Sequence, residues 1–187
     1  MTFKSDIHRR RSIRLPGYDY SRPGAYYITV CTHERELWFG EVVEREVRLS
    51  PAGRIVESVW QSLPQRFTGL ALDSFVVMPN HIHGVLMFVR AQFTAPVPLN
   101  DSKQTPNLGE IVRTMKAAST SRIRATGETG FGWQRNYYEH VIRNEAELRR
   151  IRAYVAANAL RWHEDPENPT VHGATKAAVT SEPPWAR

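Results

Sequence analysis

The sequence predicts an α+β domain whose antiparallel sheet has the split-βαβ, ferredoxin-like (RRM-like) order, with helices packed on one face. Strand-like and helix-like patterns follow in the order strand, helix, strand, strand, helix, strand, helix, which is typical of this class. Only Pro79-Asn80 separates the two middle strands, and so short a turn favours antiparallel pairing. We expect one domain over residues 24–162, between a basic arm at 1–23 and a polar, disordered tail at 163–187.

The first third of this domain begins with a strongly strand-forming run. Residues 24–33 (GAYYITVCTH) combine β-branched and aromatic side chains. Residues 41–49 alternate in polarity and predict a short peripheral hairpin. Ser50-Pro51 then marks the start of a helix, which we expect Pro64 to end. The buried side of this helix consists of Ile55, Val56, Val59, Trp60 and Leu63, which follow helical spacing.

The central strand pair, residues 73–90, contains the motif His81-Ile82-His83. On a strand, residues i and i+2 project from the same face, so the two histidines lie side by side and Ile82 faces the other way. Two imidazoles on a rigid strand supply two ligands of a divalent-metal site that still needs an oxygen ligand. Taken alone, the motif is explained equally well by a pair of half-exposed strand histidines without a metal.

The rest of the chain continues the alternation of helix and strand. Residues 91–106, rich in Pro, Asn, Gln and Thr, predict a mobile loop, and residues 108–124 predict an amphipathic helix. Residues 131–142 form an aromatic strand-like run, and residues 145–162 a last helix capped by Asn144. The expected apolar stripes are Leu108, Ile111, Val112, Met115, Ala118 and Ile123 in the first helix, and Leu148, Ile151, Val155, Ala159 and Trp162 in the last.

The net charge and the cysteine content indicate which class of partner the protein binds and in which compartment it works. Lys and Arg number 25 against 19 Asp and Glu, giving a formal net charge of +6. This surplus favours an acidic partner, nucleic acid first and an anionic membrane second, although many soluble proteins are equally basic without such a partner. Cys31 is the only cysteine, which excludes an internal disulfide and a cysteine-based zinc cluster and fits a reducing cytoplasm. No apolar run approaches the roughly 20 residues of a membrane span, and the N-terminus does not read as a secretory signal.

Tyr154 and Asn158 are candidate partners of the histidine pair. They are spaced i, i+4 on the predicted last helix, so they share a face just off its apolar stripe. Together with His81 and His83, a phenol and an amide oxygen would suit Mg²⁺ or Mn²⁺ in a site that cleaves phosphodiesters. Spacing alone favours a plainer arrangement, in which Tyr154 packs at the rim of the core and Asn158 begins to unwind the helix.

Tyr137 and Tyr138 are rival nucleophiles. In a strand they face opposite ways, so only one of them could approach the active face of the sheet. Neither has an amide residue one helical turn further on. We expect His140 to form a structural hydrogen bond rather than to act in the site.

Five short motifs along the chain carry a family resemblance. The histidine pair lies in VMPNHIHG at residues 77–84, and the other four are SIRLPGYDY at 12–20, IVR at 111–113, WQRNYYEHVIR at 133–143 and YVAAN at 154–158. In this order they resemble the HUH single-strand DNA transposases, most of all the REP-associated tyrosine transposases and their insertion-sequence relatives. The resemblance covers most of the predicted domain and is far more specific than His-x-His alone.

The resemblance implies a fold of the HUH endonuclease type and a role for each motif residue. His81 and His83 would bind a divalent metal, Mg²⁺ or Mn²⁺, with Asn158 as third ligand. Tyr154 would attack a phosphorus of single-stranded DNA, giving a 5′-phosphotyrosine link and a free 3′-OH. Reversal of this step joins strands, so the implied function is DNA transposition on hairpin or REP-like DNA.

At the third ligand the chain departs from the family pattern. Insertion-sequence members often have Gln at the position of Asn158, whereas REP-associated members tend to have Asn followed by Pro. Here Ala159 follows. A water molecule could bridge the shorter Asn158 side chain to the metal.

Single-stranded or hairpin DNA is the partner that the resemblance implies, and the basic charge agrees with it. Arg14, Arg113, Lys116 and Arg135 are the candidate DNA contacts, because phosphates attract such side chains. A solvated tail or helix face explains the basic residues of the arm and of the 108–124 helix equally well. Some relatives are homodimers that exchange the tyrosine helix and others are monomers, and both remain open. Bound to DNA, a cytoplasmic protein of this kind would be nucleoid-associated.

Two other functions compete with DNA cleavage. A ferredoxin-like nucleic-acid-binding module without cleavage activity has no need of His81, His83 or Tyr154, yet all three are present. A histidine-based phosphoesterase for small molecules typically adds a third histidine two positions on, or repeats a His-x-Thr pair. Position 85 is Val, and Thr follows neither histidine at that spacing.

Overall fold

The computed structural model describes residues 19, 22–89, 107–165 and 167–169. Arg14, the predicted 91–106 loop and residues 170–187 of the predicted tail therefore lie outside the described residues. In the part that is described, no helix is long and apolar enough to cross a membrane.

A four-stranded sheet forms the centre of the domain. Its strands are β1 (Gly24–Cys31), β4 (Leu70–Met78), β5 (His81–Phe88) and β6 (Tyr138–Ile142). Their order in the sheet is β4-β5-β1-β6, and every neighbouring pair is antiparallel. α1 (Pro51–Gln61) connects β1 to β4, and α3 (Leu108–Ala125) connects β5 to β6. This is the split-βαβ order of a ferredoxin-like domain, so the predicted fold class is confirmed.

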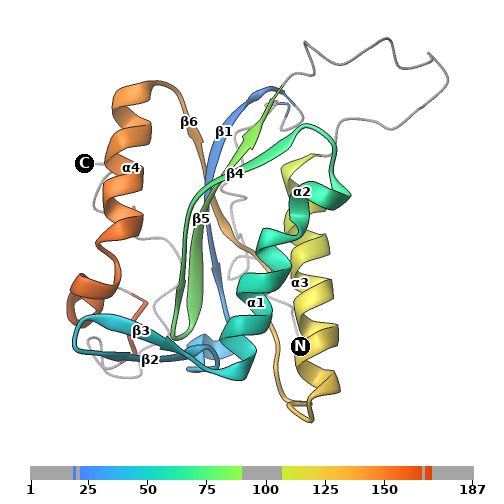
Figure 1. Cartoon of the computed structure of the whole chain (residues 1–187), viewed down its shortest axis with the longest axis vertical. Coiled ribbons are helices and arrows are strands. Elements are labelled where there is room, and N and C mark those ends of the chain that lie inside the picture. Colours follow the sequence, from blue (N-terminus) through green and yellow to red (C-terminus); the bar gives the residue numbers. More distant parts are fainter. Residues whose placement is uncertain (1–18, 20–21, 90–106, 166, 170–187) are drawn as a thin grey trace, which may run out of the picture.

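Helices cover both faces of this sheet (Figure 1). α1 and α3, which belong to the split-βαβ unit, lie together on one face, as expected. α4 (Glu145–Ala156) follows the last strand and lies on the opposite face, which the prediction of helices on one face did not include. α4 lies there because its apolar side chains, Leu148, Ile151 and Val155, pack against Tyr27 and Val85 of the sheet.

The two faces bury different amounts of apolar surface. On the α1 and α3 side the core contains Tyr26, Ile28, Val30, Val56, Val59, Trp60, Ile82, Leu86, Leu108, Ile111, Val112, Met115 and Ile123. The α4 side has a smaller apolar cluster of Ala25, Tyr27, Val85, Ile142, Leu148, Ile151 and Val155. Strand side chains alternate between the faces, so each strand contributes to both clusters. The smaller cluster leaves space on its face for polar side chains.

Gly84 of β5 allows α1 to lie directly on the strand that contains the histidines. A Cβ at Gly84 would come within 2.3 Å of a ring carbon of Trp60. The Trp60 ring is also stacked on Phe75 of β4, with centroids 4.5 Å apart and an interplanar angle of 9°. The outer end of the Trp60 ring thus lies against the backbone of β5, on the face opposite His83.

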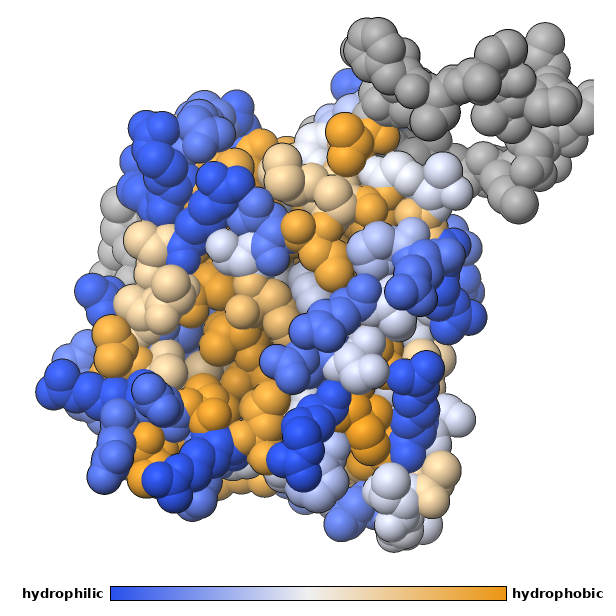
Figure 2. All heavy atoms as spheres, viewed as in Figure 1, coloured by the Kyte–Doolittle hydropathy of each residue, from blue (hydrophilic) through white to orange (hydrophobic). Residues whose placement is uncertain are grey.

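Peripheral elements surround this core. β2 (Gly40–Val43) and β3 (Glu46–Leu49) form the predicted peripheral hairpin, which is a separate two-stranded sheet. The 3-10 helices η2 (His33–Arg35) and η3 (Ala159–Glu164) follow β1 and α4. Figure 2 shows apolar side chains gathered between α4 and α1, where β4 is the edge strand, with hydrophilic side chains on both sides.

Helix starts agree with the sequence predictions, whereas two helix ends differ. Ser50 caps α1 by accepting from the Gly53 amide, and Asn144 caps α4 by accepting from the Glu147 amide. α1 ends at Gln61, and Pro64 lies in the first turn of a short second helix, α2 (Leu63–Arg66), where proline is tolerated. α4 ends at Ala156 rather than at residue 162, and a turn at residues 157–158 leads into η3.

The last strand is shorter than the predicted 131–142 run. Strand pairing with β1 begins only at Tyr138, and before it a single bridge joins Trp133 to Thr32. Phe131 and Trp133 instead turn into an aromatic cluster with Phe39, at centroid distances of 5.7 and 5.1 Å. Burial of these rings against the core replaces ladder pairing in this segment.

Candidate metal centre

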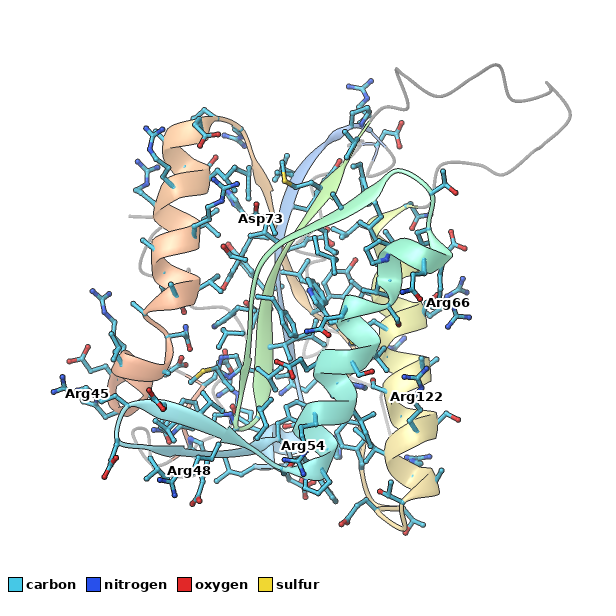
Figure 3. All side chains as sticks on the ribbon, viewed as in Figure 1. Arg45, Arg48, Arg54, Arg66, Asp73 and Arg122 are labelled. Carbon is cyan, nitrogen blue, oxygen red and sulfur yellow. The ribbon has the colours of Figure 1, made fainter. Side chains whose placement is uncertain are left out.

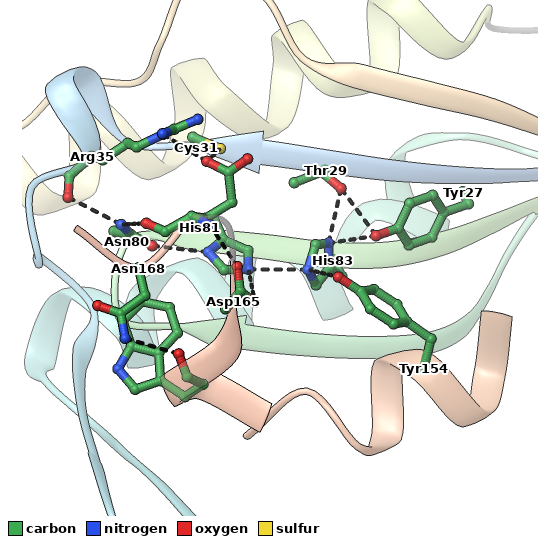
Figure 4. A network of polar contacts seen from close by, with 12 residues as sticks. Tyr27, Thr29, Cys31, Arg35, Asn80, His81, His83, Tyr154, Asp165 and Asn168 are labelled. Carbon is green, nitrogen blue, oxygen red and sulfur yellow. Dashed lines mark hydrogen bonds and ion pairs between the residues drawn. The ribbon is translucent and has the colours of Figure 1, made fainter. Parts of the chain in front are cut away.

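His81 and His83 project from β5, an inner strand, toward the side that α4 covers. Both are buried, with 0% and 3% of their surface exposed. Their Nε2 atoms lie 3.0 Å apart and face each other (Figure 4). The structure thus places the predicted pair side by side on one face, and replaces the half-exposed alternative by full burial.

Asn80 fixes which nitrogen of His81 carries the proton. The Nδ2 group of Asn80 donates to the carbonyl oxygens of Arg35 and Glu167, at 3.1 and 2.7 Å. Carbonyl oxygens only accept, so Asn80 Oδ1 must be the atom 2.9 Å from His81 Nδ1. His81 therefore donates its Nδ1–H to Asn80, and its Nε2 carries a lone pair.

His83 is held from the other side by two hydroxyl groups of β1. Its Nδ1 lies 2.7 Å from the Tyr27 hydroxyl and 2.9 Å from Thr29 Oγ1. Thr29 donates to Tyr27, so Thr29 Oγ1 is free to accept the Nδ1–H of His83. In the tautomer of His83 that is protonated at Nδ1, two Nε2 lone pairs face each other, an arrangement that a cation bound to both stabilises. Without a cation, a proton on His83 Nε2 allows this atom to donate a hydrogen bond to His81 Nε2.

Burial keeps both imidazoles neutral, the form in which histidine binds metals. Loss of hydration lowers the pKa of His83 to about 3. Burial also holds the pKa of His81 well below its usual value, and the nearby His83 and Arg35 lower it further. At neutral pH, protons therefore do not compete with a metal ion for the Nε2 atoms.

Tyr154 of α4 brings its hydroxyl group to the same place. The hydroxyl oxygen lies 3.5 Å from His83 Nε2, and the two rings have centroids 5.3 Å apart. Burial, and next the charge of Asp165, raise the pKa of Tyr154 well above its usual range, while the Asn158 side chain opposes this rise. Tyr154 is thus a neutral phenol that requires positive charge nearby to become a good nucleophile.

Asp165 is a site residue that the sequence analysis assigned to the polar tail. Its Oδ2 lies 3.9 Å from His81 Nε2, and it is 6% exposed. Burial, and to a lesser extent the charge of Glu167, raise the pKa of Asp165 to about 6. Asp165 is part of the structure because the turn after α4 and η3 bring it back over the histidine pair (Figure 4).

His81, His83 and Asp165 can hold a metal ion. One ligand atom from each lies within 4.8 Å of the others. Two atoms bound to the same ion at about 2.1 Å are at most about 4.2 Å apart, so any adjustment needed is small. Two imidazoles and a carboxylate suit Mn²⁺, Fe²⁺ or Zn²⁺ better than Mg²⁺, which prefers oxygen ligands.

Asn158 lies just beyond the end of α4 and is 2% exposed. Its Oδ1 is buried and has no hydrogen-bond partner among the described residues. A buried acceptor without a partner is costly, and a metal ion or a metal-bound water would satisfy it. Asp165 is therefore a second candidate for the oxygen ligand, where the sequence predicted only Asn158.

The other predicted site residues lie elsewhere. Arg113 is exposed on α3, on the far side of the sheet from the histidines, and Arg135 is exposed in the segment before β6. Lys116 Nζ donates to the carbonyl oxygens of Gln134 and Asn136, and burial lowers its pKa to about 8. Lys116 thus has a structural role in joining α3 to that segment.

The rival aromatic and histidine residues have other contacts. Tyr138 packs edge-on to Tyr27 in the apolar cluster under α4, with centroids 6.2 Å apart. Tyr137 faces the opposite core, where Lys116 lies 5.8 Å above its ring. His140 Nε2 is 2.7 Å from Glu147 Oε1, which matches the expected structural hydrogen bond.

Comparisons with known proteins found a related sequence and solved structures of similar fold. No family model matches the chain. An uncharacterized protein of Haemophilus influenzae is 36% identical over 171 residues, which cover 87% of this chain and 95% of that protein. Among solved structures, a REP-associated tyrosine transposase bound to a REP hairpin has a TM-score of 0.49 and 19% identity, covering 85% of this chain and 74% of that one. A candidate transposase of Deinococcus radiodurans has a TM-score of 0.43 and 19% identity, over 76% and 95% of the two chains.

Proposed function

The chain belongs to the family of the Haemophilus influenzae protein, and we propose that it is a metal-dependent nuclease and strand transferase that acts on single-stranded or hairpin DNA. The proposed reaction proceeds through a 5′-phosphotyrosine link and serves DNA transposition. The motif resemblance to the HUH transposases supports this function, and so does the geometry of the buried site.

One observation carries the proposal most directly. The Tyr154 hydroxyl comes from a helix 71 residues away in sequence and lies 3.5 Å from His83 Nε2, the atom that faces His81 Nε2. A tyrosine that served only to fill the rim of the core would have no need to meet a metal-ligand set. The convergence of phenol, imidazoles and carboxylate supports a nucleophile placed beside a cation.

Each residue then has a defined task. His81, His83 and Asp165 hold the metal, with Asn158 as a further ligand, either direct or through water. When bound, a Mn²⁺ or Mg²⁺ ion supplies positive charge to the scissile phosphate and the phenol. The Tyr154 oxygen forms a bond to phosphorus, and the bond between phosphorus and the 3′ oxygen breaks. The phenol gives up its proton to solvent, and the departing 3′ oxygen takes one.

The whole set lies on one chain, because α4 packs on its own sheet. We therefore propose that Tyr154 acts in cis, and that a single chain is sufficient for cleavage. The surplus of basic residues, including the exposed Arg113 and Arg135, supports DNA as the partner. A DNA-acting enzyme of this kind would work in the cytoplasm.

A cleavage assay with labelled hairpin DNA tests the function. The substrate is single-stranded DNA from the region flanking the gene, labelled at its 3′ end, with Mn²⁺ or Mg²⁺. We expect the label to become covalently attached to the wild-type protein. Tyr154→Phe should form no adduct and should still bind the DNA, and Tyr138→Phe, the matched control, should form the adduct normally.

Other outcomes identify the competing functions. DNA binding without cleavage by the wild-type protein would indicate a binding module. Metal-dependent hydrolysis that survives in Tyr154→Phe would indicate a phosphoesterase in which water is the nucleophile. Either result would overturn the proposal.

A further inference from the structure

Three residues after η3 form what we call the docked segment: Asp165, Glu167 and Asn168. All three are buried, although they follow a polar stretch of sequence. The Glu167 amide donates to Asp165 Oδ1 at 2.7 Å, and the Asn168 amide donates to the Asp165 carbonyl at 3.0 Å. These local bonds fix the Asp165 side chain relative to Glu167, so the position of one determines that of the other.

Glu167 attaches this segment to the sheet on the side of His81. Its Oε2 accepts from Arg35 Nε at 2.7 Å and from the Cys31 thiol at 3.4 Å. The Arg35 and Glu167 side chains are only 17% and 11% exposed, so water screens this ion pair weakly. Cys31 is paired with His81 across the strands β1 and β5, which places this attachment beside the metal ligands.

Asn80 joins the docked segment to the histidine pair. It is fully buried, and its side chain makes three contacts: to the Arg35 carbonyl, to the Glu167 carbonyl and to His81 Nδ1. The first two contacts fix the orientation of the amide group. That orientation makes Oδ1 the acceptor for His81, and so leaves His81 Nε2 free to bind the metal. Figure 4 shows Asn80 between Arg35 and His81.

We propose that Asn80 is a positioning residue that couples docking of Asp165, Glu167 and Asn168 to the metal affinity of His81 and His83. This inference rests on the proposed metal site. When the segment is docked, Asn80 is held with Oδ1 toward His81, and Asp165 lies at the site. When it is released, Asn80 loses the Glu167 carbonyl, the closer of the two contacts that fix its orientation, and Asp165 leaves the site. Because coupling is reciprocal, metal binding must also hold the segment in place.

Arg35→Gln separates this coupling from simple electrostatics. Removing a cation near the site strengthens binding of a metal ion by Coulomb's law alone. The coupling predicts weaker metal binding instead, because loss of the Arg35–Glu167 ion pair releases the docked segment. We expect Mn²⁺ affinity, measured by electron paramagnetic resonance without DNA, to fall by about 10-fold or more, the usual effect of losing a group that orients metal ligands.

Arg45→Gln is the matched control. Arg35 and Arg45 both have a left-handed backbone conformation, with φ of 59° and 69°. Arg45 is exposed at the outer end of the β2–β3 hairpin (Figure 3). Its replacement should leave Mn²⁺ affinity unchanged. Unchanged or tighter Mn²⁺ binding in Arg35→Gln, with the Arg45→Gln value at the wild-type level, would overturn the coupling.

Hydrogen exchange supplies a second readout that a merely structural role for Asn80 would not produce. Mn²⁺ should slow exchange of the Glu167 and Asn168 amides in the wild-type protein, and should slow it much less in Arg35→Gln. Asn80→Asp should also weaken Mn²⁺ binding, although it adds negative charge, because a carboxylate would face two carbonyl oxygens. Equal slowing in wild type and Arg35→Gln would contradict the inference.

These measurements need no DNA, so they separate the inference from the proposed function. If Tyr154→Phe and wild type bind Mn²⁺ alike and Arg35→Gln binds it weakly, the coupling holds even where no adduct forms. If the wild type forms the adduct and Arg35→Gln binds Mn²⁺ as tightly as wild type, the coupling is wrong and the function stands.

Discussion

The two faces of the central sheet are made by the same strands and yet differ in chemistry. In β5, Ile82 and Leu86 enter the large apolar core under α1 and α3, whereas His81 and His83 enter the polar site under α4. In β1, Thr29 lies on the histidine side between core residues that face away. Stability comes mainly from one face, and this allows buried polar groups to be held rigidly on the other.

His83→Ala should produce the largest effect, a loss of metal binding and cleavage at the α4 face, and should leave the other face of the sheet unchanged. Losing one of two imidazoles removes the metal, which is worth several kcal/mol of transition-state stabilisation, so cleavage should fall by about 10³-fold or more. The chain should still fold, because the larger core lies on the other face. His163→Ala, which changes an exposed histidine of η3, is the control in the cleavage assay and in Mn²⁺ titration.

If His83→Ala kept both metal binding and cleavage, His83 would not belong to the site. Loss of cooperative unfolding in this variant, followed by circular dichroism, would show instead that the α4 face contributes as much to stability as the core does.

Gly84→Ala should have the next largest effect, on stability. The added methyl group meets the Trp60 ring, which cannot retreat because Phe75 stacks on it. Overpacking of this kind costs about 1–3 kcal/mol of unfolding free energy, measurable by urea denaturation. Gly130→Ala is the matched control, since the nearest atom to a Cβ there is 3.9 Å away.

Mn²⁺ affinity of folded Gly84→Ala should stay close to the wild-type value, because the clash lies on the other face of β5. A large loss of metal affinity in protein that is still folded would show that the two faces are not independent.

The smallest effect concerns the ion pair that joins α4 to the edge strand. Arg152 Nε and Nη2 donate to Asp73 Oδ1 and Oδ2 at 2.8 and 2.7 Å, and Asp73 faces α4 in Figure 3. Hydrogen bonding from Arg152 lowers the pKa of Asp73 to about 2. The unfolded value is about 3.9, so this stabilisation is present above pH 4 and is lost as pH falls toward 2.

Urea denaturation of wild type and Asp73→Asn at several pH values tests the sign. The wild type should be more stable at pH 6, and the difference should shrink between about pH 4 and pH 2. The Arg152 side chain is 41% exposed, so added salt should also reduce the difference. A difference that is constant across this pH range would contradict the role of the carboxylate charge.

Much of the fold followed from the sequence, because alternation and helical spacing are local signals. The Pro79-Asn80 turn gave the antiparallel pairing of β4 and β5, and the i, i+2 spacing placed His81 and His83 on one face. Which face of the sheet α4 covers could not be predicted from the sequence, because the apolar stripe of this helix could pack against either face.

Asp165 was missed because no periodic pattern marks it. Its approach to His81 depends on the turn at residues 157–158 and on η3, where helical spacing predicted a continuous helix. That prediction also placed Asn158 on the same helix as Tyr154, whereas it lies past the helix end. The signal available was the acidic run after Trp162, but charged side chains are mostly exposed and seldom indicate a buried site.

Mass spectrometry of the DNA-linked peptide tests the central claim most directly. After cleavage of hairpin DNA with Mn²⁺, trypsin should release a peptide of residues 153–161, between Arg152 and Arg161, that carries a nucleotide 5′-phosphate on Tyr154. That result would show that the tyrosine beside His83 is the nucleophile. A nucleotide found on the peptide that contains Tyr138, or cleavage with no linked peptide at all, would contradict it.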